Sequence, residues 1–531
     1  MAVRLLSMGS TVSSSDPRLL LGIDIGTASS KGVLTDVAGR IVASATVPHG
    51  VDTPSPGHFE QDADGVWWND LLELTSILLA DHRSGDIAAV AVSAIGPCVL
   101  PLDASGVPLR PGILYGIDSR ASEECRELTQ LYGRPFTSQS VVPKLLWLQR
   151  NEPEVWARTR SIVGAEGYLV LRLTGARTLD RYLAANYAPF VGGTGSGSGS
   201  SSGSASGSGS ASASGSGSAS DPASAVSDNF DLQWTPDDPL FPSAMRPDLV
   251  WSTDVVGHIT PEAALATGLA VGTPVIAGTA DAAAEATSAG LAVPGDLMLM
   301  YGSTAFFILQ CATLPQSDVF WPGVFLSPGT YALAGGTNNL GSVTAWFREQ
   351  LGAHDDFAQL AALAASSPPG AHGLTALPYL AGERTPINDP LARGAVFGLT
   401  LAHTRADIYR ALLEGIAYSI RDNIETMAAE GHAPTRVLAV GGATQNPLLL
   451  QLVSDVTGLT QLLPAEAIGA SLGNALRAGV GVGVFADLAQ AASTVEFARK
   501  VTPDESLRAT YDAGFARFRR LYALTSEFNG S

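Results

Sequence analysis

The chain has 531 residues, of which 46% are hydrophobic and 15% are charged, and its net charge at pH 7 is −19. A soluble chain of this length is too long for one hydrophobic core, so we expect two domains of roughly 250 residues. The acidic balance disfavours nucleic acid and anionic membranes as main partners. No run of 18 apolar residues occurs, which predicts no membrane span.

Three cysteines, Cys98, Cys125 and Cys311, lie far apart and show neither a CxxC pair nor a Cys/His metal spacing. Their low, odd number argues against a disulfide framework and favours a reducing cytoplasm. Residues 1–18 lack the apolar core of a signal peptide and are expected to be a disordered extension.

The next segment, residues 19–27, is an apolar run that ends in the polar residues Asp24, Gly26 and Thr27. We predict a buried strand, a tight turn and then a hairpin formed by residues 33–35 and 41–43. Successive N–H groups with a threonine hydroxyl hold phosphate oxygens, and Asp24 is suited to hold Mg²⁺ through water. An ordinary strand–turn–strand is the alternative. Lys31 either reaches a phosphate or is a solvated lysine of the hairpin.

Residues 62–78 place apolar side chains at helical spacing, and residues 87–92 predict a buried strand that leads into a loop containing Cys98. Loops at the carboxyl ends of strands bind ligands in open α/β sheets. Cys98 is therefore a candidate substrate contact, and a packed, unreactive thiol is the alternative. Asp118 and Arg120 in the next loop either bind a ligand or pair with each other in a surface salt bridge.

Residues 195–220 contain only Gly, Ser and Ala, which build no packed core and behave as a flexible coil. We assign residues 192–227 to a surface-loop insertion within the first domain. An engineered linker and a natural low-complexity segment both remain open. The domains are expected at residues 19–252 and 253–500, followed by a C-terminal helix or tail at residues 501–531.

The second half repeats the opening theme of a strand that ends in small and polar residues. One such strand precedes Asp281, and the next ends at Gly302, Ser303 and Thr304. A third strand, residues 437–440, precedes the group Gly441, Gly442, Ala443 and Asn446. Asn446 is expected to be the N-cap of the following helix, whose N-terminus would suit an anion. The repetition suggests an internally duplicated architecture, with a helix N-cap as the alternative role of Asp281.

The sequence lacks two common nucleotide motifs. No GxxxxGK[ST] loop occurs and no GxGxxG follows a strand, which disfavours the folds that depend on them. Two hydroxyl-bearing loops, one in each expected domain, instead suit a nucleotide held in a cleft between the domains.

Together these segments resemble the FGGY carbohydrate kinases of the actin and hexokinase superfamily. The most specific match is residues 394–399, then seven residues, then residues 407–414, which fit the second signature of the family throughout. The first signature fits only from Lys144 onwards, because Gln139 and Val141 depart from its preceding positions. The resemblance covers about residues 19–190 and 228–500 and is supported by residues 278–281, 301–304 and 382–386.

This resemblance implies an α/β enzyme with two ribonuclease-H-like (actin-like ATPase) domains and a cleft between them. Such an enzyme transfers the γ-phosphoryl group of ATP to a sugar hydroxyl, with Asp281 as the general base. Asp24 and Asp281 would lie at the Mg²⁺ ion that neutralises the phosphates. The implied nucleotide-binding residues are Asp24, Gly26, Thr27, Lys31, Gly302, Ser303, Thr304, Gly441, Gly442, Ala443 and Asn446. The candidate substrate-binding residues are Cys98, Asp118, Arg120 and Asp281.

The sequence defines the sugar that accepts the phosphoryl group less well than it defines the nucleotide-binding residues. Glycerol kinases carry Asn-Gln-Arg-Glu-Thr after this strand and xylulose kinases Ser-Gly-Gln-Met-His-Gly, whereas residues 93–98 are Ser-Ala-Ile-Gly-Pro-Cys. We expect a ketose such as a pentulose, or a sugar alcohol, as substrate of a cytoplasmic enzyme, and a homodimer is an open option. A non-catalytic regulatory homologue and an actin-like or chaperone ATPase are the alternatives. The retained Asp24 and Asp281 disfavour the regulatory homologue. The complete match to the second family signature disfavours the actin-like or chaperone ATPase.

Overall fold

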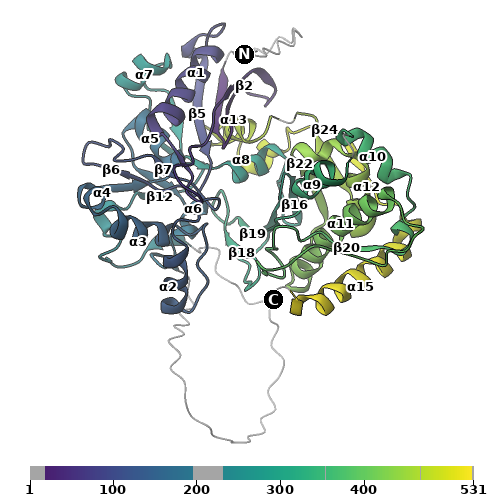
Figure 1. Cartoon of the computed structure of the whole chain (residues 1–531). Helices are drawn as coiled ribbons and strands as arrows, with labels where there is room; N and C mark the ends of the chain where they lie inside the picture. Colours follow the sequence, from purple (N-terminus) through teal and green to yellow (C-terminus); the bar gives the residue numbers. More distant parts are fainter. Residues whose placement is uncertain (1–17, 195–230, 353–354, 467, 529–531) are drawn as a thin grey trace, which may run out of the picture.

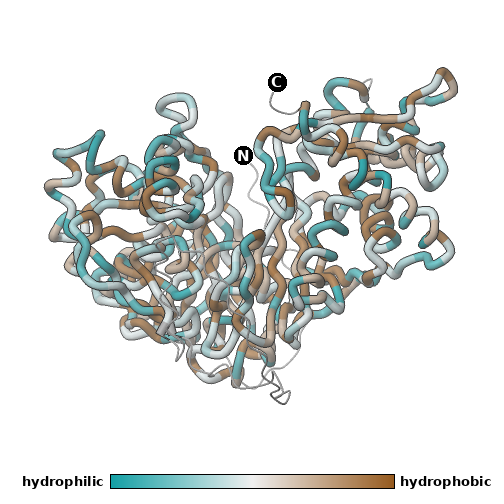
Figure 2. The backbone as a smooth tube through the Cα atoms, turned by 90° about the horizontal axis from the view of Figure 1, so that it is seen from below, coloured by the Kyte–Doolittle hydropathy of each residue, from teal (hydrophilic) through white to brown (hydrophobic). Residues whose placement is uncertain are grey.

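The computed structural model describes residues 18–194, 231–352, 355–466 and 468–528. These residues form two lobes, each built around a seven-stranded sheet (Figure 1). The hydrophobic stretches of chain run mainly through the interior of each lobe (Figure 2). Residues 1–17 of the expected extension and residues 195–227 of the expected insertion lie outside the described residues. Within the described ranges, no helix combines the length and the apolarity needed to cross a bilayer.

The first sheet has the strand order β13-β14-β5-β1-β2-β3, and β15 also pairs with β5. Its strands are β1 (Leu19–Ile25), β2 (Ser29–Asp36), β3 (Ile41–Pro48), β5 (Ile87–Ala94), β13 (Val255–His258), β14 (Pro274–Ile276) and β15 (Thr279–Ala280). β1 is buried along its whole length, as its apolar sequence predicts. The predicted hairpin is confirmed, because β2 pairs antiparallel with both β1 and β3.

The second sheet has the order β18-β19-β17-β16-β22-β23-β24. Its strands are β16 (Asp296–Tyr301), β17 (Ala305–Cys311), β18 (Trp321–Val324), β19 (Tyr331–Thr337), β22 (Arg436–Val440), β23 (Gln461–Pro464) and β24 (Phe497–Val501). β16 corresponds to β1, because each has an antiparallel neighbour from a hairpin on one side (β17, β2) and a parallel neighbour on the other (β22, β5). A second parallel strand and an antiparallel edge strand then follow in both sheets. The expected duplication is thus confirmed at the level of topology.

Helices cover both faces of the first sheet. α1 (Asn69–Leu78) and α5 (Ala165–Thr174) share one hydrophobic core with Leu21 and Ile23 of β1. α13 (Ala470–Gly481) packs on the opposite face, where Leu20 of β1 points. Because side chains alternate along a strand, the two cores draw on alternate residues of β1.

A layer of helices also covers the second sheet, on the face opposite α8 (Asp281–Ser288). These helices are α9 (Gly341–Leu351), α10 (Phe357–Ala365), α11 (Arg405–Ala429), α12 (Pro447–Thr457) and α15 (Arg508–Thr525). α15 falls within the expected C-terminal tail, and its Phe515 and Phe518 belong to the hydrophobic core of this lobe. The described part of the tail is therefore an integral part of the second domain.

The remaining elements lie mainly between these layers. The helices are α2 (Ser122–Tyr132), α3 (Val141–Asn151), α4 (Pro153–Arg158), α6 (Arg181–Ala184), α7 (Pro261–Thr267) and α14 (Leu488–Ala492). The strands are β4 (Glu60–Gln61), β6 (Leu100–Leu102), β7 (Gly112–Ile113), β8 (Ser161–Val163), β9 (Thr178–Asp180), β10 (Val191–Thr194), β11 (Asp231–Trp234), β12 (Asp248–Val250), β20 (Thr375–Leu377) and β21 (Ala395–Phe397). β10 pairs antiparallel with β11, so the chain enters and leaves the Gly/Ser/Ala segment at adjacent points.

The division between the two sheets does not fall at the expected boundary between residues 252 and 253. β13, β14 and β15 follow that boundary in sequence but belong to the first sheet. α13 also packs on β1 and β5, although it lies near the end of the expected second domain. β1 pairs with one edge of β5. The other edge of β5 pairs with β14 and β15, which come much later in the chain and so complete the first sheet.

α8 links the first sheet to the second and packs against α13. A Cβ atom at Gly473 of α13 would lie 1.8 Å from the carbonyl oxygen of Ala284 in α8, so the two helix backbones touch there. On its other side, α8 places Ala283 and Ala286 in one core with Met298 and other residues of the second sheet. The small side chains of α8 thus allow close packing between the two lobes.

Candidate active site

Three polar residues meet at the carboxyl ends of strands in the first sheet. Asp24 lies opposite Ser93 in the parallel pair of β1 and β5, and Thr279 of β15 lies opposite the same serine. The Ser93 hydroxyl donates to Asp24 Oδ1 at 2.6 Å. Asp281 follows two residues after Thr279, as the first residue of α8. The structure therefore brings Asp24 and Asp281 to the same edge of the sheet.

The two carboxyl groups interact electrostatically. Burial raises the pKa of Asp281, and the negative charge of Asp24 raises it further. Burial also raises the pKa of Asp24, although the Ser93 hydrogen bond and the charge of Lys31 act in the opposite direction. Carboxylate oxygens are the ligands that Mg²⁺ prefers, and a cation here would stabilise both ionised groups. In the described part of the chain, no group of three or more His, Cys, Asp or Glu side chains is arranged to hold a metal ion.

Lys31 lies close to the carboxyl groups of Asp24 and Glu285. It lies directly opposite Asp24 in the pair of β1 and β2 and is half-buried. Its positive charge lowers the pKa of Asp24 and that of Glu285. Glu285 is absent from the sequence-based candidates, although it lies one helical turn after Asp281 and such pairs share one helix face. Burial raises the pKa of Glu285 to about 7.

The loop between β1 and β2, residues 26–28, is called loop 1 here. All three of its carbonyl groups accept hydrogen bonds from the body of the first domain. His49 Nε2 donates to the Gly26 carbonyl at 2.9 Å, Gln61 Nε2 donates to the Thr27 carbonyl at 3.1 Å, and the His49 amide donates to the Ala28 carbonyl at 3.1 Å. In a trans peptide the N–H points opposite to the C=O, so the amides of Thr27 and Ala28 point the other way. Such a pair of amides suits a phosphate oxygen.

Loop 2, residues 302–304 between β16 and β17, has the same organisation. The amide of Gly341 donates to the Gly302 carbonyl at 3.1 Å, and the amide of Ser342 donates to the Ser303 carbonyl at 2.9 Å. Both donors lie at the N-terminus of α9. The amides of Ser303 and Thr304 therefore point away from α9, and both side chains are exposed.

The group Gly441, Gly442 and Ala443 lies beside loop 2, because β22 pairs with β16 up to Met300 and Val440. Gly441 has a φ of +95°, and a Cβ there would lie 2.7 Å from the Tyr301 carbonyl oxygen, so only glycine suits the position. Asn446 is the N-cap of α12, as predicted, and its Oδ1 accepts from the amides of Leu448 and Leu449 at 3.1 Å each.

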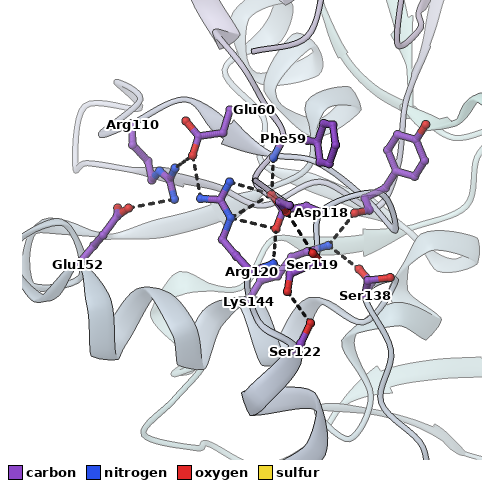
Figure 3. A network of polar contacts seen from close by, with 12 residues as sticks. Phe59, Glu60, Arg110, Asp118, Ser119, Arg120, Ser122, Ser138, Lys144 and Glu152 are labelled. Atoms are coloured by element: carbon purple, nitrogen blue, oxygen red, sulfur yellow. Dashed lines mark hydrogen bonds and ion pairs between the residues drawn. The ribbon is translucent and has the colours of Figure 1, made fainter. Parts of the chain in front are cut away.

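Asp118 and Arg120 pair with each other, as the alternative from the sequence proposed, but the ion pair is buried and does not lie at the surface (Figure 3). Their side chains are 0% and 1% exposed, and Arg120 Nη2 lies 2.8 Å from Asp118 Oδ2. Arg120 Nη1 also bonds Glu60 at 2.7 Å. The ammonium group of Lys144 donates to the carbonyls of Tyr115 and Ser138 on the same side of the network. These contacts pair Arg120 with two carboxylates and give the Lys144 ammonium group two backbone acceptors.

Cys98 is fully buried, and its thiol donates to the Ile95 carbonyl at 3.2 Å. Burial and the charge of Glu166 raise the pKa of the thiol above its ordinary value. The charge of Asp281 adds to this effect, so Cys98 lies near the candidate base. The structure therefore describes a packed thiol, as the alternative from the sequence proposed.

Comparison with known proteins identifies the family. Residues 19–188 match the description "FGGY family of carbohydrate kinases, N-terminal domain", and residues 297–482 match the corresponding C-terminal domain. The chain belongs to the FGGY family of carbohydrate kinases. It is thus a carbohydrate kinase with the two-domain, actin-like ATPase fold that the sequence resemblance implied.

Several relatives match the FGGY chain over nearly its whole length. A xylulose kinase from Staphylococcus epidermidis is 28% identical over 526 residues, covering 96% of this chain and 97% of the relative. A gluconokinase from Bacillus subtilis is 24% identical and covers 86% of each chain. The crystal structure of a xylulose kinase from Rhodospirillum rubrum is 31% identical, has a TM-score of 0.82 and covers 97% of this chain and all of the other.

Proposed function

We propose that this FGGY kinase transfers the γ-phosphoryl group of ATP to a hydroxyl group of a small ketose, with Asp281 as the general base. The observation that carries this proposal is the position of Asp281 on α8. It lies beside Asp24 at the carboxyl edge of the first sheet, on the helix that joins this sheet to the one bearing loop 2. A base placed there can accept the proton of a sugar hydroxyl as its oxygen attacks phosphorus.

The roles of the other residues follow from their contacts. The amides of Thr27, Ala28, Ser303 and Thr304 would bind phosphate oxygens, because the loop carbonyls are held on the opposite side. Gly441, Gly442 and Ala443 would border the adenosine, next to loop 2. Asp24 and Asp281 would hold Mg²⁺ through water, and Lys31 would balance their charge. Mg²⁺, when bound, supplies positive charge to the β- and γ-phosphates.

The substrate class is proposed from the names of the relatives together with the chain's own loop. Xylulose kinases recur among proteins that match nearly the whole chain, which favours a pentulose. Residues 93–98 nevertheless lack the side chains that xylulose kinases carry there. Cys98 is buried and Asp118 and Arg120 bond each other, so these three would shape the sugar pocket from behind.

The test measures ADP release from Mg-ATP with pentuloses, hexuloses, gluconate, polyols and glycerol as acceptors. We expect activity on one group of acceptors, and a loss in kcat of about a hundredfold or more in Asp281→Asn. The matched control is Asp81→Asn, because Asp81 is exposed and lies in the turn after α1, outside the candidate site. Retained activity in Asp281→Asn would contradict the role of the base. Nucleotide binding without turnover on any acceptor would instead favour a regulatory homologue.

A further inference from the structure

We propose that His49, held by Asp70, is a positioning residue that orients loop 1 so that its backbone amides face the nucleotide. This inference rests on the proposed function, because it takes loop 1 to bind phosphate. His49 follows directly after β3, and Asp70 lies in the first turn of α1. We refer to the two residues as the clasp.

The clasp is defined by three short hydrogen bonds. His49 Nδ1 lies 2.6 Å from Asp70 Oδ2, and His49 Nε2 lies 2.9 Å from the Gly26 carbonyl oxygen. The Ser30 hydroxyl donates to Asp70 Oδ2 at 2.7 Å. Each side chain of the clasp is 7% exposed. Both ring nitrogens of His49 thus face acceptors, and only the doubly protonated imidazolium donates from both nitrogens.

The contact with Gly26 fixes the orientation of a peptide. With the Gly26 carbonyl bonded to His49, the amide of Thr27 points to the opposite side, where the phosphate would lie. In loop 2 the equivalent bonds come from backbone amides of α9, which do not titrate. Loop 1 therefore depends on a titratable side chain where loop 2 depends on a helix terminus.

The charges around the clasp support a protonated ring. Burial opposes the charge of His49, but hydrogen bonds to Asp70 and to the Gly26 carbonyl outweigh it and raise the pKa of His49. Asp70 is the charged group on the α1 side of the sheet that contacts the ring. Asp24 of β1 and Lys31 of β2 lie opposite each other, and the hydrogen bond that Asp24 accepts from Ser93 lies on the face that α13 covers.

Deprotonation of the His49 ring would break its hydrogen bond to the Gly26 carbonyl. A neutral ring keeps one N–H, which Asp70 would retain at Nδ1 because a carboxylate is the stronger acceptor. The lone pair of Nε2 would then face the Gly26 carbonyl oxygen, and the two would repel each other. Nucleotide affinity should therefore fall as the pH rises through the raised pKa of His49. Titration of Asp24 acts in the opposite sense, because protonation at low pH removes its charge.

The experiment measures Mg-ADP binding by calorimetry without sugar, between about pH 6 and pH 9. For His49→Phe we expect affinity about tenfold weaker at neutral pH and independent of pH at the alkaline end. His49→Gln should recover part of the affinity, because an amide donates without titrating. Asp70→Asn should move the alkaline loss of affinity to lower pH. His258→Gln, which changes an exposed histidine of β13, is the control and should match the unmodified protein.

The outcomes separate this inference from the proposed function. If the unmodified protein binds no nucleotide, the proposed function fails and the inference with it. If it binds Mg-ADP and the three clasp variants bind equally well at every pH, only the inference is overturned. Histidine ring NMR of the unmodified protein gives a test without substitutions. A His49 ring that is neutral at pH 6 would also overturn the inference.

Discussion

The side-chain amide of Asn474 donates a hydrogen bond to the carbonyl of Ile23 at 2.7 Å, although the two residues are 451 positions apart. The same amide donates to Ser93 Oγ at 2.7 Å, and Ser93 donates to Asp24 at 2.6 Å. A helix near the end of the chain thus supports the carboxylate at the end of the first strand. The hydrogen bonds from Asn474 through Ser93 to Asp24 thus link the packing of α13 to the chemistry of the site.

We expect Ser93→Ala to shift the acid limb of Mg-ATP binding to higher pH. The Ser93 hydrogen bond favours the charged form of Asp24 and lowers its pKa, so its loss raises the pKa. Calorimetric titration of Mg-ATP over a pH series measures the shift. Ser105→Ala, at an exposed serine, is the control. An unchanged acid limb would mean that Asp24 does not govern nucleotide binding.

Gly473→Ala should destabilise the protein, although alanine is the better helix former by about 1 kcal/mol. The new Cβ would lie 1.8 Å from the Ala284 carbonyl oxygen, so α8 and α13 must separate. Overpacking of this kind costs about 1–3 kcal/mol, which urea unfolding detects. At Gly85 a Cβ has open space, so Gly85→Ala is the matched control. Equal stability of both variants would show that α8 and α13 can move apart without a loss of free energy of unfolding.

The third prediction concerns Glu285, one turn after Asp281. Burial and then the charge of Asp24 raise the pKa of Asp281, and the charge of Glu285 adds to the effect. Because a general base must be deprotonated, kcat/KM should fall as the pH drops through this raised pKa. Glu285→Gln removes one negative charge and should move the fall to lower pH, by less than about one unit.

The pH profile of kcat/KM in Glu285→Gln is compared with that of Glu262→Gln, which changes an exposed residue of α7. If the acid limb has the same position in both variants, the charge of Glu285 does not affect the pKa of Asp281. A limb that moves to higher pH would contradict the sign of the interaction.

Arg120→Met should lower the free energy of unfolding by about 3–5 kcal/mol, because it leaves Asp118 buried without its charge partner. A surface salt bridge would be worth less than about 1 kcal/mol. Urea unfolding at neutral pH measures the difference, with Arg126→Met at an exposed position of α2 as control. A loss below 1 kcal/mol would indicate that water enters the network.

Local patterns predicted much of the fold and part of the site. The hairpin after residue 19, the N-cap at Asn446 and the duplicated strand theme depend on neighbours in sequence, and the structure has all three. The family resemblance placed Asp24 and Asp281 at one Mg²⁺ site, whereas the expected boundary had put Asp281 in the second domain; the structure shows that β15, just before Asp281, belongs to the first sheet. The family signatures then indicated the type of chemistry.

Contacts between distant segments could not be predicted in this way. The clasp of His49 and Asp70 joins a strand end to a helix with no motif to mark either residue. The pairing of Asp118 with Arg120 was foreseen, but its burial was not, because burial depends on which loops pack above it.

The amino-acid sequence by itself determined the strands, the turns and the acidic residues at their ends, since these depend on periodicity and on backbone preferences over a few residues. Only the tertiary structure decided that β13, β14 and α13 complete the first domain and that His49 supports loop 1. The physical reason is that burial and hydrogen bonding across hundreds of residues arise from packing, which no local window of sequence contains.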